Sequence, residues 1–147
     1  NRYAQGFGVH QAFGVLINDE GNDSYWAMTA ADQGSAWDIA AGCLLDKSGN
    51  DSYAANAMTQ GSAAQQAIAY LIDLRGVDSY SGTTPAQGES GSNEYHWESS
   101  HTYSFSALLD FGGDEDSYSL GRKNNSTKIL QPNPEPAGSG VGLFVDH

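Results

Sequence analysis

The chain has 147 residues, enough for one domain with a sizeable core, and its 39% of apolar residues together with 18 glycines argue against disorder. Six Lys and Arg residues against 18 Asp and Glu residues give a net charge of -12. Nucleic acids and anionic membrane surfaces repel such a protein, so both are excluded as natural partners. No apolar run approaches the roughly 18 residues of a membrane-spanning helix, so we expect no membrane insertion.

One ten-residue sequence recurs along the chain. It spans 16–25, 44–53 and 71–80, returns one residue longer at 108–118, and starts again at Phe144. The tyrosines that close the four copies are 28, 27 and 38 residues apart, and a Gln-Gly pair precedes each of the first three by 20 residues. Recurrence at a fixed period indicates a single repeat domain over 1–147, with units that end near residues 25, 53, 80 and 118.

The six residues before each acidic turn alternate in size, which predicts strands at 12–17, 40–45, 67–72, 104–109 and 140–145. Their first and third positions hold only Ala, Gly or Ser, whereas the second, fourth and sixth are mostly larger and apolar. A period of two is typical of a strand. We therefore expect an all-β fold, a β-solenoid of about five 27–28-residue coils. The alternative is a strand-plus-helix solenoid, because 63–69 has good helical propensity.

Smaller features follow from the same pattern. The closing tyrosines are expected to stack as a core column. Cys43, the lone cysteine, is expected to be a small core side chain. Two segments break the repeat: an insertion at 89–103 and an irregular, proline-containing loop at 121–139. The loop carries two overlapping glycosylation sequons, at Asn124 and Asn125.

The insertion supplies a candidate ligand site. Its rings offer flat apolar faces for a sugar, and its spacing does not match a metal motif. The candidate ligand-binding residues are Tyr95, His96, Trp97, Glu98, His101 and Tyr103.

The repeated turns supply a candidate metal site. Stacked repeats would bring like carboxylates to about 5 Å from each other, and Ca²⁺ prefers such oxygen ligands. The alternative is a solvated acidic edge whose Asp side chains cap their own turns. The candidate metal ligands are Asn18, Asp23, Asp46, Asp51, Asp73, Asp78, Asp110 and Asp116.

Two resemblances extend these expectations. Gly21 to Tyr25 and Gly49 to Tyr53 resemble half of the RTX nonapeptide, which implies calcium bound between turns of a secreted protein. The longer unit, from Gln-Gly to Leu-Leu-Asp-x-x-Gly-x-Asp-x-Tyr, is similar to tandem repeats in large exported bacterial proteins over residues 3 to 118.

Together these patterns predict an extracellular or cell-surface structural or adhesive module without catalytic activity. We expect it to be stabilised by Ca²⁺ and to form part of a longer array or fibre. Its expected partners are neighbouring repeats or copies of itself, end to end. The alternative is a carbohydrate-binding module that uses the 89–103 insertion. A polysaccharide-active enzyme is a third reading, for which we find no paired carboxylates at a suitable spacing.

Overall fold

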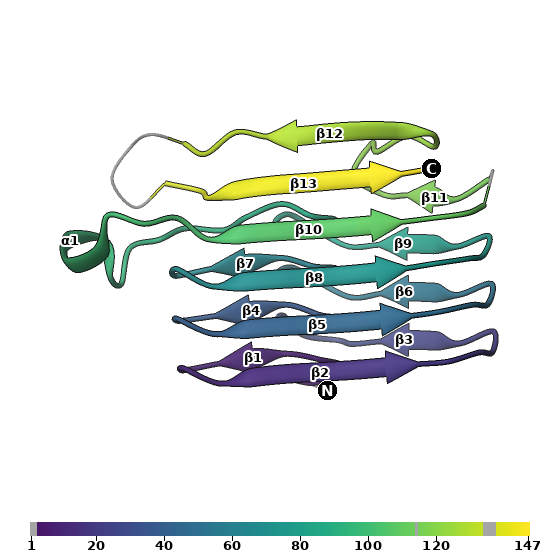
Figure 1. The fold of residues 1–147 in the computed structure, drawn as a ribbon, viewed down its shortest axis with the longest axis horizontal. Helices are drawn as coiled ribbons and strands as arrows, with labels where there is room; N and C mark the ends of the chain where they lie inside the picture. Colours follow the sequence, from purple (N-terminus) through teal and green to yellow (C-terminus); the bar gives the residue numbers. More distant parts are fainter. Residues whose placement is uncertain (1–2, 114, 134–137) are drawn as a thin grey trace.

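The computed structural model describes residues 3–113, 115–133 and 138–147, and the described chain is mostly β (Figure 1). Its strands form three sheets. The first sheet contains β1 (Gly8–Val9), β4 (Ala36–Trp37) and β7 (Ala63–Ala64). The second contains β2 (Phe13–Asn18), β5 (Ala41–Asp46), β8 (Ile68–Asp73), β10 (Phe105–Asp110), β13 (Val141–Asp146) and β12 (Ser126–Leu130). The third contains β3 (Ser24–Trp26), β6 (Ser52–Ala54), β9 (Ser79–Ser81) and β11 (Ser117–Tyr118).

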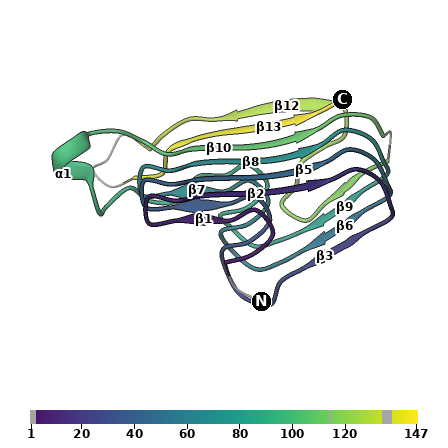
Figure 2. The same ribbon diagram turned by 60° about the horizontal axis from the view of Figure 1, so that its bottom comes forward.

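The repeats pair in register, so equivalent residues lie beside each other. Leu44 of β5 aligns with Leu16 of β2 on one side and with Leu71 of β8 on the other. Tyr53 of β6 lies in the same way between Tyr25 and Tyr80. The two short sheets lie on the inner side of the six-stranded sheet (Figure 2). Residues at equivalent positions of the repeats therefore form rows across each sheet.

The strands before the acidic turns are confirmed, each one residue later than predicted. In β5 the burial alternates: Gly42, Leu44 and Asp46 are buried and the residues between them are half-buried. The small residues and the leucine column thus face the inner side, and the bulkier columns face outward. Cys43 lies on the outward side and is half-buried, so the expectation of a core cysteine is wrong.

The expected β-solenoid of about five coils is wrong. The strands form three separate sheets, the longest is mixed because β12 runs antiparallel to β13, and the fifth repeat adds a strand to that sheet alone within the described part of the chain. The reason lies in the spacers, where left-handed residues such as Gln33 and Gln60 interrupt the extended backbone between one sheet and the next.

The strand-plus-helix alternative is also wrong. Residues 63–69 form β7, two left-handed glutamines, Gln65 and Gln66, and the start of β8. The described residues contain one helix, α1 (Trp97–Ser100), within the insertion. None of the described helices could span a membrane.

The core is built from the repeated aromatic and aliphatic columns. The rings of Tyr25, Tyr53, Tyr80 and Tyr118 stack with centroids 4.9, 4.8 and 4.9 Å apart and planes within 8° of parallel. The leucine column packs against them and ends at Phe144. The predicted tyrosine column is confirmed.

The Gln-Gly pairs tie the tyrosine strands to the core. Gln33, Gln60 and Gln87 are fully buried, and each donates a hydrogen bond from its side-chain amide to the carbonyl oxygen of a column tyrosine at 2.8 to 3.0 Å. The sequence shows these pairs only as register markers, because the repeat itself does not reveal which carbonyl each amide reaches.

The loop at 121–139 is only partly irregular, because β12 occupies Ser126–Leu130 as an antiparallel edge strand. Residues 134–137 of that loop lie outside the described residues, as does Asp114 of the fourth turn. β12 lies outside β13 at one edge of the long sheet, and β2 forms the other edge.

Candidate functional site: a buried row of carboxylates

Seven of the predicted metal ligands form one row, in which all but the half-buried Asp23 are buried. We call it the carboxylate row: Asp23, Asp46, Asp51, Asp73, Asp78, Asp110 and Asp116. They make three triads whose ligand atoms lie within 4.8 Å of one another. The triads are Asp23, Asp46 and Asp51, then Asp51, Asp73 and Asp78, then Asp78, Asp110 and Asp116. Asp51 and Asp78 each belong to two triads, so the row is continuous.

Two positions of the repeat supply the row. Asp46, Asp73 and Asp110 end parallel strands of the long sheet and are in register, so their carboxylates are neighbours. The second position follows the glycine corner, where Asp51 is only 3% exposed and Asp78 only 2%. Each triad draws its carboxylates from two adjacent repeats.

Two of the strand-end carboxylates, Asp73 and Asp46, accept hydrogen bonds with both oxygens. One oxygen of Asp73 accepts the backbone N–H of Arg75 in its own turn at 3.1 Å, and the other accepts the hydroxyl of Tyr53 at 2.6 Å. Asp46 accepts the N–H of Ser48 and the hydroxyl of Tyr25 in the same way. Capping of their own turns is therefore observed at this position.

The corner carboxylates bridge repeats instead. Oδ1 of Asp51 accepts the backbone N–H of Asp23, Oδ1 of Asp78 accepts that of Asp51, and Oδ1 of Asp116 accepts that of Asp78, each at 2.6 Å. Among the described residues, the second oxygens of Asp51 and Asp78 are buried and have no hydrogen-bond donor, and neither has Oδ1 of the strand-end Asp110. A buried carboxylate oxygen without a donor is costly.

Burial dominates the electrostatics of the row. It raises the pKa of Asp78 to about 8, and the nearby charges of Asp73, Asp110 and Asp51 add to this rise. Burial likewise raises the pKa of Asp110 to about 7 and that of Asp73 to about 6, with neighbouring carboxylates contributing. The pKa of Asp51 is also raised, first by burial. Simultaneous ionisation of all the carboxylates in the row is therefore unfavourable.

The protein's own cations do not neutralise the row. In the described part of the chain, the ion pairs of Lys and Arg join Lys47 to exposed Asp19 at 2.6 Å and Arg122 to Glu89 at 2.9 Å. Neither pair includes a carboxylate of the row. Neutralisation of the carboxylate row therefore requires protons or a bound cation.

The spacing of the carboxylate oxygens in the row is compatible with a bound metal ion. Oxygens up to 4.8 Å apart can bracket an ion that they bind at about 2.4 Å. The unpaired oxygens of Asp51, Asp78 and Asp110 supply acceptors that the protein itself leaves unused.

The eighth predicted ligand, Asn18, stands at the first repeat. Its Oδ1 accepts the N–H of Glu20, and its amide nitrogen donates to Asp23 and to the hydroxyl of Tyr25. At the other end, Asp146 shares the hydroxyl of Tyr118 with Asp110. Asn18 aligns with Asp46 in register, so it stands at the first-repeat end of the row.

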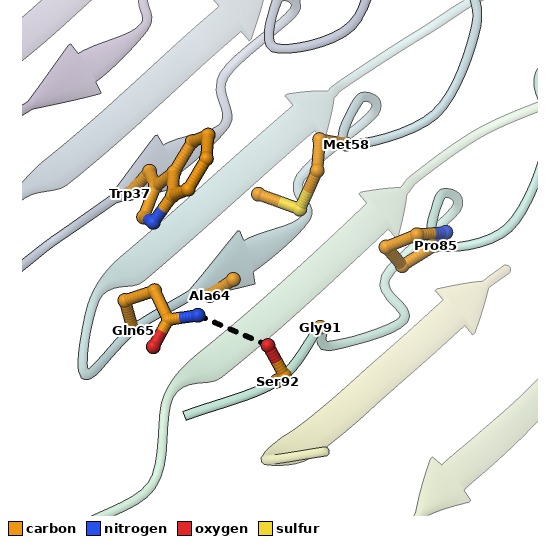
Figure 3. A pocket seen from close by; sticks show the side chains of 7 residues that line it. All are labelled: Trp37, Met58, Ala64, Gln65, Pro85, Gly91 and Ser92. Carbon is orange, nitrogen blue, oxygen red and sulfur yellow. Dashed lines mark hydrogen bonds between the residues drawn. The ribbon is translucent and has the colours of Figure 1, made fainter. Parts of the chain in front are cut away.

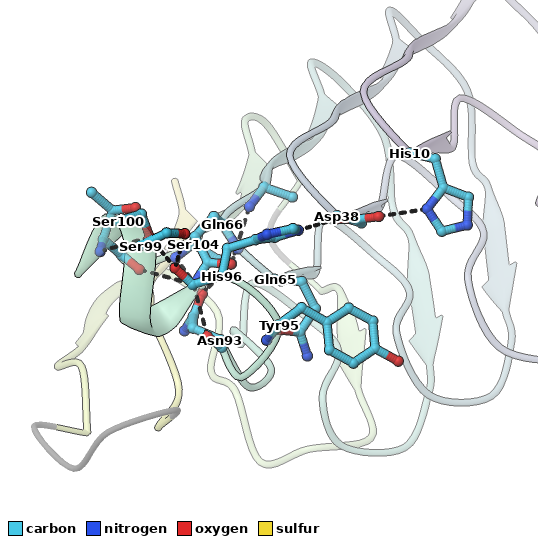
Figure 4. A network of polar contacts seen from close by, with 12 residues as sticks. His10, Asp38, Gln65, Gln66, Asn93, Tyr95, His96, Ser99, Ser100 and Ser104 are labelled. Atoms are coloured by element: carbon cyan, nitrogen blue, oxygen red, sulfur yellow. Dashed lines mark hydrogen bonds and ion pairs between the residues drawn. The ribbon is translucent and has the colours of Figure 1, made fainter.

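The residues of the insertion do not form one platform. Trp97 packs at tilted angles against His101 and Tyr103, Glu98 is exposed, and the ring of Tyr95 stacks on Trp37 at 6.0 Å. His96 bonds to Asp38, which also bonds to His10 at 2.6 Å (Figure 4). Through Trp37 and Asp38, these contacts fasten the insertion to the second repeat.

A shallow cavity of about 270 Å³ opens beside Trp37 (Figure 3). Its lining is mostly apolar and includes Met58 and Pro85. The side-chain amide of Gln65 donates to Ser92 at 3.0 Å, and its oxygen accepts the N–H of Tyr95. The cavity thus has few polar atoms left for a ligand.

The predicted glycosylation sites differ in exposure. Asn125 is exposed just before β12, whereas Asn124 is half-buried. Of the two, Asn125 is the more accessible position.

Comparisons with known proteins identify no relative of this chain. No family model, no curated protein and no solved structure matches this chain.

Proposed function

We propose that the chain is a calcium-stabilised structural or adhesive repeat module that works outside the cell. The observation that carries this proposal is the carboxylate row with its unpaired buried oxygens on Asp51, Asp78 and Asp110. A cation bound there would replace repulsion between carboxylates with attraction to a shared charge.

Calcium fits the ligand set better than other common cations. The ligands are hard oxygens without His or Cys, which disfavours zinc and copper. Magnesium keeps most of its waters, and a row of closely spaced, buried carboxylates leaves little room for them. Calcium accepts irregular oxygen cages and can use a carboxylate with both oxygens. Since Asp51 and Asp78 are shared, occupation of one triad would favour the next by fixing a common ligand.

A structural role follows from where the triads lie. Each one spans two repeats, so a bound ion would hold the stack together. The edge strands β1, β2 and β3 of the first repeat have unpaired backbone groups on their outer side, which suits end-to-end contact with a further repeat or copy. Calcium is abundant outside cells, and extracellular modules use weak sites.

A calcium titration of the dialysed chain tests the proposal. The melting temperature should rise with calcium in EDTA-treated protein, by an amount equivalent to about 3 kcal/mol at one hundred times the dissociation constant. Magnesium at the same concentration should raise it much less. An unchanged melt and no heat of binding in calorimetry would refute the calcium site.

A second candidate function is carbohydrate binding beside the insertion. Tyr95 is 61% exposed and stacks on Trp37, which lines the cavity, so part of an aromatic pair is open to a sugar. A glycan array with the Tyr95→Ala variant as control tests this function. Equal patterns for both proteins, or no binding by either, would exclude it.

A further inference from the structure

The outward side of the six-stranded sheet is apolar and uncovered. We call the outward side of β2, β5, β8, β10 and β13 the outer face. Its three columns start at Phe13, Val15 and Ile17 and continue through the other four strands without a charged residue. No described segment crosses this face in either view (Figures 1 and 2).

The outer face has the size of an interface. Phe13 is 71% exposed, Ile17 is 59% exposed and Ile68 is 47% exposed. Five strands about 4.8 Å apart and six residues of about 3.3 Å each give roughly 500 Å² of nearly flat surface. Monomers rarely expose more than a few hundred Å² of contiguous apolar surface. A partner covering it would bury on the order of 1,000 Å² in total, which is the lower limit for a specific interface.

The composition of the face favours a second copy over a charged partner. On the same strands Asp46, Asp73 and Asp110 lie on the buried side, so two copies could meet here without opposing their carboxylates. A basic or acidic partner would find no counter-charge on the face and would lose the hydration of its own charges.

The strand order makes the face complementary to itself. β8 lies in the middle of the five parallel strands, with β5 and β10 on its two sides. A two-fold axis along β8 sets β5 of one copy opposite β10 of the other. Because the columns are in register, Ala41 of one copy then faces Phe105 of the other, so a large ring meets a small side chain at two symmetric places. Such size matching is the condition for close packing of two sheets.

From these observations we infer that the outer face is the interface of a homodimer in which two six-stranded sheets pack against each other about a two-fold axis along β8. This contact is distinct from the end-to-end contact of the edge strands, and it does not depend on the carboxylate row.

Sedimentation equilibrium from 1 to 100 µM, in calcium and in EDTA, tests the dimer. The wild type should approach twice the chain mass as concentration rises. Ile68→Lys places a charge at the start of the central strand of the face, at a position exposed enough for the monomer to fold, and should weaken the dimer at least tenfold. The matched control is Met28→Lys, at a residue that is 65% exposed and lies outside the three sheets; it should leave the dimer unchanged.

The lone cysteine gives a second measurement. Cys43 lies on the outer face, so its labelling by a thiol reagent should slow as wild-type concentration rises, and should not depend on concentration in Ile68→Lys. Circular dichroism and melting would verify that both variants are folded. A wild type that stays monomeric at 100 µM, even if another protein binds its face, would overturn the proposal, and so would a dimer that Ile68→Lys leaves intact.

Discussion

The backbone N–H of Asp51 donates a hydrogen bond to Oδ1 of Asp78 at 2.6 Å, while Oδ2 of the same carboxylate is buried and has no donor in the described part of the chain. One oxygen therefore links two repeats through the backbone, and the other is left unpaired. Oδ1 thus bridges two repeats, and Oδ2 remains as an acceptor for the proposed cation.

Replacement of Asp78 by Asn should have opposite effects with and without calcium. Asn keeps an oxygen to accept the N–H of Asp51 but removes a buried charge that belongs to two triads. In EDTA we expect the free energy of unfolding to rise by about 1–3 kcal/mol, because a desolvated carboxylate is lost. In calcium the stabilisation by the ion should fall sharply. Urea unfolding under both conditions gives the two values.

The matched control is Asp19→Asn in the first turn. The carboxylate of Asp19 is 78% exposed and pairs with Lys47, so its loss should change stability by less than about 0.5 kcal/mol in either condition. If Asp78→Asn behaves like this control, the carboxylate row has no electrostatic role.

Without calcium, stability should fall as the pH rises from about 4 to 8. The ordinary pKa of an Asp is 3.8, and in the folded protein that of Asp73 is about 6, that of Asp110 about 7 and that of Asp78 about 8. Over this range the folded state binds more protons than the unfolded state, so the free energy of unfolding decreases with pH. Asp38 titrates below this range, because its bonds to His10 and His96 lower its pKa.

Urea unfolding in EDTA at several pH values between 4.5 and 8.5 measures this slope. Calcium should flatten it, since the ion replaces the protons at neutral pH. The Asp78→Asn variant should lose the part of the slope near pH 7 to 8. A stability that increases over the whole range would contradict the raised pKa values.

Much of the fold could be predicted from the repeat alone. The size alternation before each turn predicts the five strands, because a face of Ala, Gly and Ser next to a leucine column fits only a pleated segment with one side buried. The tyrosine column follows from the same register. The three-sheet arrangement could not be predicted, because no sequence pattern identifies the left-handed backbone at Gln33 and Gln60.

For the candidate site, the sequence predicts which carboxylates meet but not how each is hydrogen-bonded. Asp73 and Asp78 are five residues apart in one repeat, yet only Asp73 receives a tyrosine hydroxyl. Which carboxylate oxygens remain unpaired depends on side-chain geometry around Tyr53, which a pattern of residue types cannot specify. In the insertion, by contrast, the aromatic residues are evident in the sequence. The residues that they contact, Trp37 and Asp38, lie far from them along the chain and could not be predicted.

Replacement of Tyr53 by Phe should destabilise the protein by about 1–3 kcal/mol. The ring column is kept, and the loss is the hydroxyl that donates to Asp73 at 2.6 Å in a fully buried site. The expected drop in the urea midpoint should be larger in EDTA than in calcium, because a bound ion would partly satisfy the carboxylate. Tyr95→Phe, at a ring that is 61% exposed, is the control and should have little effect. Equal midpoints for Tyr53→Phe and wild type would show that this hydrogen bond does not stabilise the fold.

Replacement of Gly49 by Ala should be the most disruptive of these changes. A Cβ at Gly49 would overlap the carbonyl oxygen of Gly21 in the neighbouring repeat, and backbone atoms cannot move aside without breaking the register. We expect a loss of more than about 2 kcal/mol and weaker calcium binding, because Asp51 follows this corner.

Gly121→Ala separates the steric effect from the conformational one. Gly121 has a φ of +67° and no atom within 4 Å of a Cβ, so Ala there should cost only the left-handed conformation, about 1 kcal/mol. Thermal unfolding of the two variants, with and without calcium, makes the comparison. Similar melting temperatures for both would mean that the repeats can separate enough to admit a methyl group, and the close stacking of the glycine corners would then contribute little to the carboxylate row.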